Sequence, residues 1–183
     1  MSAGEPEYAL EPATFRSMLE AQELTDTLEE NLQDRRMGAA SVRPEVVELF
    51  SELVNNAAEH GLSPEGANAH VRYMPHRRGT AFDVVVADSG PGIRATLAGN
   101  PSLSQPETDA EAIGLAAQEL VSGSGIPTRG IGLWMTVTEM RKPGRKLWIQ
   151  SGSGLLTMYG ASEPEVREIE HRQGTMVRLT IPA

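Results

Sequence analysis

A helix predicted over residues 44–60 carries an acid and an amide at a spacing that suits chemistry. Glu52 and Asn56 are four residues apart, so in a helix they lie within roughly 40° of each other, one turn apart. They border the apolar stripe of that helix, where a carboxylate can orient a nucleophile and an amide oxygen can ligate a hard cation. Taken alone, the pair also fits a plain exposed polar edge, which is the commoner occurrence.

The stretch "DVVVADSGPGI", residues 83–93, joins an apolar strand to an acid and two glycines. At the strand end, the Asp88 carboxylate can accept a hydrogen bond from an amino group such as that of adenine. Gly90 and Gly92 would let the backbone approach a flat ring. The alternatives are a plain turn and a dinucleotide fingerprint in "GPGIRA". The fingerprint is disfavoured because its helix would be very short and no second acid-terminated strand follows about 20 residues later.

A third stretch, "TRGIGL" at residues 128–133, precedes another predicted helix. Gly130 and Gly132 would present free N–H groups and the positive end of the helix dipole to an anion, and Arg129 adds a mobile charge. The alternative is a flexible junction between a loop and a helix. The sequence contains no P-loop, no nucleophile elbow and no zinc-binding histidine spacing.

Helices on one face of a sheet are the elements that must position these residues. Helical patterns cover residues 13–34, 44–60, 110–121 and 131–142, and the first of these lies on the domain or against a partner. Strand patterns cover residues 68–76, 80–88, two segments within 146–160 joined by a "GSG" hairpin, and 174–182. The flexible stretches around the helix at 110–121 are typical of a lid. The pattern predicts a two-layer α+β sandwich with a mixed sheet.

Length and composition limit the classes of function. The chain has 183 residues, 39% of them hydrophobic, which suits one well-buried domain. A net charge of -9 argues against a nucleic-acid surface, because phosphate binding relies on clustered Lys and Arg. No apolar run is long enough to span a bilayer, and no secretory signal is recognisable. We therefore expect no membrane partner and a cytoplasmic location by default.

Four blocks in this order resemble the GHKL family of ATP-binding domains, which includes gyrase, histidine kinases and MutL. They are "ELVNNAAEHG" (52–61), "DSGPGI" (88–93), "RGIGL" (129–133) and "GTMVRLTIP" (174–182). The resemblance implies a Bergerat-type fold, with helices on one face of a mostly antiparallel sheet. It implies an ATP-binding domain at residues 44–183, with an ATP lid at about 94–129. Residues 1–43 remain as a helical N-terminal extension that the resemblance does not cover.

The resemblance also implies roles for single residues. Asn56 would hold a Mg²⁺ ion that bridges the ATP phosphates, and Glu52 would be the general base. Asp88 would bind the adenine amino group, with Thr175 in support. The remaining expected nucleotide contacts are Gly90, Gly92 and Ile93 at the adenine floor and Arg129, Gly130, Gly132 and Leu133 near the phosphates.

The chain is most similar to the stand-alone anti-sigma-factor or serine-protein-kinase group, whose N box often reads E-x-x-x-N-A-x-x-H-G. Many histidine kinases have Asn at the position of Glu52, and residues 1–43 contain no phosphoacceptor histidine. The similarity implies a Mg²⁺-dependent serine/threonine kinase that acts on a regulatory protein, such as a sigma factor or an antagonist of an anti-sigma factor. The alternatives are an ATP-hydrolysing switch whose lid controls dimerisation or partner binding, and a non-catalytic binding module. A homodimer is compatible with each.

Overall fold

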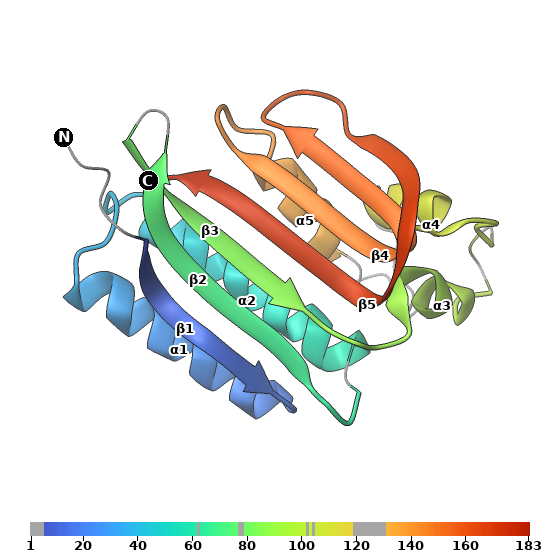
Figure 1. Ribbon diagram of the computed structural model, residues 1–183, viewed down its shortest axis with the longest axis horizontal. Helices are drawn as coiled ribbons and strands as arrows, with labels where there is room; N and C mark the ends of the chain where they lie inside the picture. Colours follow the sequence, from blue (N-terminus) through green and yellow to red (C-terminus); the bar gives the residue numbers. More distant parts are fainter. Residues whose placement is uncertain (1–5, 62, 77–78, 102, 104, 119–130) are drawn as a thin grey trace.

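Five strands form one antiparallel sheet in the part of the chain that the computed structural model describes, residues 6–61, 63–76, 79–101, 103, 105–118 and 131–183. They are β1 (Glu7–Phe15), β2 (Ala67–His76), β3 (Gly79–Ala87), β4 (Lys146–Tyr159) and β5 (Glu165–Pro182). Their order is β1-β2-β3-β5-β4 (Figure 1). The pairing of β5 with β3 therefore brings the last strand of the chain beside the strand that leads into Asp88.

Three helices, α1 (Met18–Asp34), α2 (Arg43–His60) and α5 (Ile131–Glu139), lie on one face of this sheet, behind it in Figure 1. Two short helices, α3 (Gly92–Ala98) and α4 (Asp109–Ala116), lie at one end, beside β4 and β5. This arrangement confirms the predicted two-layer α+β sandwich. The sheet was expected to be mixed and mostly antiparallel, and all four pairings of the described strands are antiparallel. Among the described residues, no helix is long and apolar enough to cross a membrane.

Helix α2 is held against the centre of the sheet by its apolar stripe. Pro44 and Glu45 occupy its first turn, where a missing N–H and a negative charge are both favourable. The stripe is buried at Val46, Leu49, Phe50, Leu53, Val54 and Ala57. It shares one core with Phe82, Val84 and Val86 of β3. Since each large buried side chain contributes roughly 1.5–3 kcal/mol, this packing fixes which side of α2 faces the end of β3.

The hairpin predicted at "GSG" is wrong, because residues 146–159 form the single strand β4. Gly152 has a φ of +58° and lies at a bulge in the pairing of β4 with β5. A Cβ atom on Gly152 would be 2.2 Å from Asp109 Oδ2, and one on Gly154 would be 2.5 Å from the Asp109 backbone. These glycines therefore admit the first turn of α4 rather than reverse the chain. The true hairpin joins β4 to β5.

The N-terminal segment was predicted to be helical, but only part of it is. Helix α1 confirms the helix from Met18 onward, but residues 7–15 form the edge strand β1, which pairs with β2. The alternation in this strand is interrupted by Pro12 and by irregular pairing, so its period was not recognisable. Ala9, Leu10 and Phe15 are nevertheless buried in the common core. Residues 7–34 thus contribute to both layers of the sandwich.

Candidate functional site

Asp88 and Thr175 are bound to each other where β3 ends beside β5. The Asp88 N–H donates to the Thr175 carbonyl oxygen at 2.8 Å, and the Thr175 N–H donates to Asp88 Oδ1 at 3.1 Å. Asp88 Oδ1 also accepts from the Gly90 N–H at 2.9 Å. The structure thus brings together an acid and a threonine that are 87 residues apart.

Three glycines allow the backbone to close around Asp88. A Cβ atom on Gly61, just after α2, would be 2.4 Å from Asp88 Cγ, and one on Gly90 would be 2.6 Å from the Gly61 backbone. Gly174 has a φ of +76°, and its Cβ would be 2.2 Å from the Asp88 carbonyl oxygen. Side chains essentially never approach so closely, so only glycine fits at these positions. The result is a narrow cradle formed by backbone and one carboxylate.

The carboxylate of Asp88 is buried and has one oxygen left to accept a hydrogen bond. Only 7% of the residue is exposed. This burial raises the pKa of the carboxyl group, while the N–H groups of Gly90 and Thr175 and the charge of Arg172 offset part of the increase. Both side-chain hydrogen bonds use Oδ1, so Oδ2 accepts none from the described residues. The free oxygen and the glycine floor fit an adenine ring with its amino group.

Gly92 and Ile93 are fastened to β4 by a residue that the sequence analysis missed, Ser151. The Ile93 N–H donates to Ser151 Oγ at 2.8 Å, and Ser151 Oγ lies 3.0 Å from Thr175 Oγ1. Gly92 has a φ of +81°, and a Cβ there would be 3.0 Å from Ser151 Oγ. The hairpin predicted at "GSG", residues 152–154, hid this role, because it treats Ser151 only as the last residue of a strand.

The sequence analysis also missed Arg172 and Gln173, whose side chains donate hydrogen bonds to carbonyl oxygens of the loop after β3. Gln173 Nε2 donates to the Gly90 carbonyl oxygen at 2.6 Å, and Arg172 donates to the Asp88 carbonyl oxygen at 3.3 Å. Both stand just before Gly174 in β5. No motif indicated them, because their partners are carbonyl oxygens that only the tertiary structure brings near.

Glu52 and Asn56 project from α2 on successive turns, as the sequence predicts, and both are partly buried. Neither side chain forms a hydrogen bond or ion pair with another residue in the described part of the chain. Among those residues, no group of three or more His, Asp or Glu could hold a metal ion. Mg²⁺ commonly uses only one or two protein ligands together with substrate phosphates, so the amide oxygen of Asn56 suits that role.

The predicted phosphate-binding residues are only partly visible. Gly132 and Leu133 lie in the first turn of α5, whereas Arg129 and Gly130 lie outside the described residues. The Leu133 side chain packs, like that of Ile93, against both apolar clusters of the domain. Any contact of Leu133 with phosphates would therefore come from its backbone. Helices α3 and α4 lie largely within the predicted lid at 94–129, and residues 119–129 are outside the described part.

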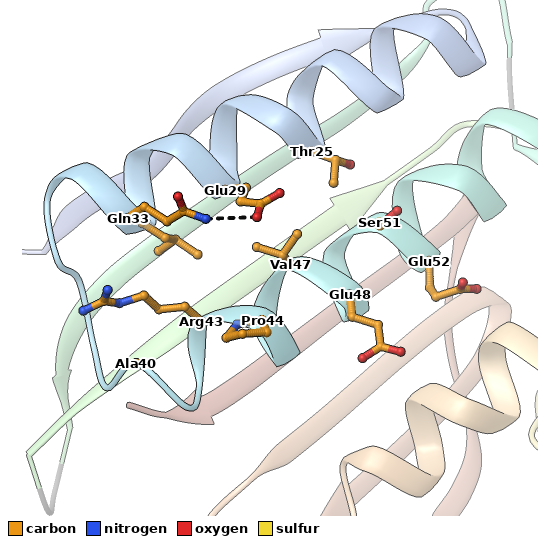
Figure 2. Close-up of a pocket in the computed structure, with 11 residues that line it drawn as sticks. Thr25, Glu29, Gln33, Ala40, Arg43, Pro44, Val47, Glu48, Ser51 and Glu52 are labelled. Carbon is orange, nitrogen blue, oxygen red and sulfur yellow. Dashed lines mark hydrogen bonds between the residues drawn. The ribbon is translucent and has the colours of Figure 1, made fainter.

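A groove of about 440 Å³ lies between α1 and α2, away from Asp88 and Thr175. Figure 2 shows Val47 pointing toward α1, whereas Glu48 and Glu52 extend from the other side of α2. Glu29 of α1 also lines the groove and accepts a hydrogen bond from Gln33 at 3.0 Å. Among the predicted site residues that the structure describes, Glu52 alone borders this groove.

The family model of the histidine kinase-like ATPase domain matches residues 15–181 of this chain. The matched range includes every residue of the site described above. It begins at Phe15, inside the segment that the sequence analysis set apart as an extension, and the domain boundary at residue 43 stays a prediction. No curated protein and no solved structure matches the chain significantly.

Proposed function

Because the chain belongs to the histidine kinase-like ATPase domain family, we propose that it is a Mg²⁺-dependent kinase that phosphorylates serine or threonine on a regulatory protein partner. ATP binding is the common property of that family. The cradle at Asp88, with its free Oδ2 and its glycine floor, supports the same property in this chain. The observation that carries the kinase assignment is the position of Glu52.

Glu52 stands one turn before Asn56, the proposed Mg²⁺ ligand, and its carboxylate pairs with no cation among the described residues. A free carboxylate beside the phosphate region can take the proton of an acceptor hydroxyl. ATP supplies the phosphoryl group: the acceptor oxygen bonds to the γ-phosphorus as the bond to the ADP oxygen breaks, and ADP keeps that electron pair. An Asn at this position could orient a group but could not accept the proton.

The groove between α1 and α2 supports a protein acceptor. It is open to solvent and combines apolar Leu32, Pro44 and Val47 with Glu29 and Arg43. Glu48 and Glu52 border it from α2, with side chains that extend from the other side of that helix. A partner segment could lie along it and continue over α2 toward the Glu52 carboxylate, which extends from the other side of that helix. Three acids, Glu29, Glu48 and Glu52, line the groove together with Arg43. This excess of negative charge favours a segment with basic residues, because unlike charges attract across an interface.

Label transfer from γ-labelled ATP tests the kinase assignment. With Mg²⁺ and a desalted extract of the source cells, we expect acid-stable label, as on serine or threonine, rather than acid-labile phosphohistidine. Glu52→Gln should reduce the rate about 10²–10⁴-fold, the typical effect of a general base, while ATP affinity stays the same. Glu48→Gln is the matched control, one turn earlier in the same groove, and should leave the rate nearly unchanged. Equal rates for wild type and Glu52→Gln would contradict the assignment.

An ATP-hydrolysing switch is the second candidate. Helix α3 starts at Gly92, directly from the proposed adenine floor, and α4 is tied to β4 by the bond from the Ser153 N–H to Asp109 Oδ2 at 2.8 Å. Occupation of the cradle could therefore change the position of α3 relative to the fixed α4. Two results together would favour the switch over the kinase. They are ATP hydrolysis without any acceptor protein and an ATP-dependent change in the mass of the assembly, as on dimerisation, or in partner binding.

A further inference from the structure

We propose that Ser151 is a positioning residue that makes the Thr175 hydroxyl a fixed hydrogen-bond donor, and that this direction selects adenine over guanine. The inference rests on nucleotide binding at the Asp88 cradle, but it does not depend on whether the phosphoryl group goes to protein or to water. Ser151 comes from β4, and nothing in the motifs of the sequence pointed to it.

The direction of the bond between Ser151 and Thr175 follows from counting donors. Ser151 is 2% exposed, so water cannot satisfy its hydroxyl. One of its lone pairs already accepts the Ile93 N–H at 2.8 Å. A buried hydroxyl proton without an acceptor is costly, and the only acceptor that the described residues offer is Thr175 Oγ1 at 3.0 Å. Ser151 therefore donates and Thr175 accepts.

Once Thr175 Oγ1 accepts from Ser151, its own proton must point elsewhere. Thr175 is partly exposed, unlike Ser151, so that proton can reach a ligand. Both backbone polar groups of Thr175, its N–H and its carbonyl oxygen, form hydrogen bonds with Asp88. The hydrogen bonds thus run in one direction, from the Ile93 N–H through Ser151 to Thr175, and such chains strengthen their terminal donor.

The site therefore presents a hydroxyl donor on Thr175, the residue whose own N–H is bonded to the Asp88 carboxylate. The Watson–Crick edge of adenine offers the complement, an amino donor beside the N1 acceptor. Guanine offers the reverse, the O6 acceptor beside an N1–H donor. In the same pose, the O6 acceptor of guanine would face the Asp88 carboxylate and its N1–H donor would face the Thr175 hydroxyl donor. Buried polar groups would then be left without hydrogen bonds, and this penalty is what makes discrimination between ligands large.

Calorimetric titration with ATP and with 1-deaza-ATP, in which C–H replaces the N1 acceptor, tests this inference. We expect the wild-type protein to bind ATP about threefold to tenfold more tightly than 1-deaza-ATP, the usual value of one hydrogen bond. Ser151→Ala and Thr175→Val should each bring that ratio close to one, and the double variant should change it no further. Thr175→Ser, which keeps the hydroxyl, should preserve the ratio. A merely structural role would weaken both ligands equally.

The matched control is Ser153→Ala, which changes a neighbouring serine of β4 whose contact with Asp109 uses only its backbone N–H. It should keep the wild-type ratio. If Ser151→Ala does not fold, Ser151→Cys retains a weak donor at the same place and should give an intermediate ratio. A wild-type ratio in Ser151→Ala or Ser151→Cys would overturn the role of Ser151 and leave ATP binding intact. Failure of the wild-type protein to bind ATP would overturn both.

Discussion

Gly90 lies directly against Gly61, so close that a Cβ atom on Gly90 would come within 2.6 Å of the Gly61 backbone. This contact joins the end of α2, which carries Glu52 and Asn56, to the loop that carries Asp88. The two halves of the site are therefore set relative to each other by backbone contact and not by long side chains. Because backbone cannot rotate out of the way, small additions here should have large effects.

Gly90→Ala should lower the free energy of unfolding by about 1–3 kcal/mol, the usual effect of forcing a methyl group into a packed region. ATP affinity should fall as well, since the Gly61–Gly90 contact fixes Asp88. Gly114→Ala in α4 is the control, because no described atom outside its chain neighbours and its own helix backbone lies within 4 Å of its Cβ position. Alanine there should raise stability by about 0.5–1 kcal/mol. Chemical denaturation measures both, and equal stability of the two variants would contradict the contact.

Asp88→Asn should separate stability from binding. Burial raises the pKa of Asp88 above its ordinary value of 3.8, so ionisation opposes folding: the stability is complete below that value and is partly lost as the pH rises through the raised pKa. The asparagine oxygen can still accept from Gly90 and Thr175. We therefore expect the variant to be more stable than wild type around pH 7 and equal to it at about pH 3.

ATP binding should respond in the opposite sense. Asparagine can present an amide donor where the adenine amino group needs an acceptor, so Asp88→Asn should reduce affinity at least about tenfold. In the wild type, affinity should weaken as the pH falls through the raised pKa of Asp88 and the carboxylate is protonated. Calorimetry over a pH series detects both effects. Pure stabilisation without loss of affinity would show that Asp88 does not contact the base.

Arg145 links α2 to the turn after α5, and its ion pair should make the free energy of unfolding depend on pH in the acidic range. Its side chain is 7% exposed, forms an ion pair with Glu45, and donates to the Glu139 carbonyl oxygen at 3.1 Å. The hydrogen bond from Arg145 lowers the pKa of Glu45 below its ordinary 4.5, against the opposing effect of burial. The corresponding stability is present above that value and is lost as the pH falls through the lowered pKa.

Arg145→Met should therefore reduce the free energy of unfolding by about 1–3 kcal/mol around pH 7 and by less at about pH 3. The control Arg141→Met removes an ion pair with Glu163 that is largely exposed, and it should change stability by less than about 1 kcal/mol. Denaturant titrations at the two pH values measure the difference. A pH-independent effect of Arg145→Met would mean that the packing of its chain matters and the charge does not.

Among the charged residues on the outer face of the sheet, Asp83 should lose the most stability when it is substituted. Its side chain is fully buried beneath Arg72, at 2.5 Å, and Arg178, at 2.6 Å. Asp83→Ala should reduce the free energy of unfolding by about 3 kcal/mol, because it leaves two guanidinium groups together without their shared partner. Arg178→Ala should cost less, since Arg72 still pairs with Asp83. Equal effects of the two substitutions in thermal unfolding would contradict this order.

Local sequence was enough to determine several parts of this protein. The stripe from Val46 to Ala57 identifies α2 with the correct exposed edge, because helical period is a property of neighbouring residues. Asp88, Gly90 and Gly92 could be recognised for a similar reason: an apolar strand followed by an acid and glycines restricts the backbone wherever it lies. These two stretches supply two of the four blocks that resemble an ATP-binding family, and the family match confirms that resemblance.

The tertiary structure decided the conformation and contacts of those stretches whose partners are distant in the sequence. "GSG" has the local composition of a turn, yet the approach of Asp109 makes it a bulge in one long strand. Residues 7–15 form a strand because the edge of β2 is open to them, not because their own period is strong. Ser151 contacts Ile93 across 58 residues, and its hydroxyl direction depends on burial. Hydrogen-bond partners and burial arise only when distant segments pack, so no local pattern could have specified them.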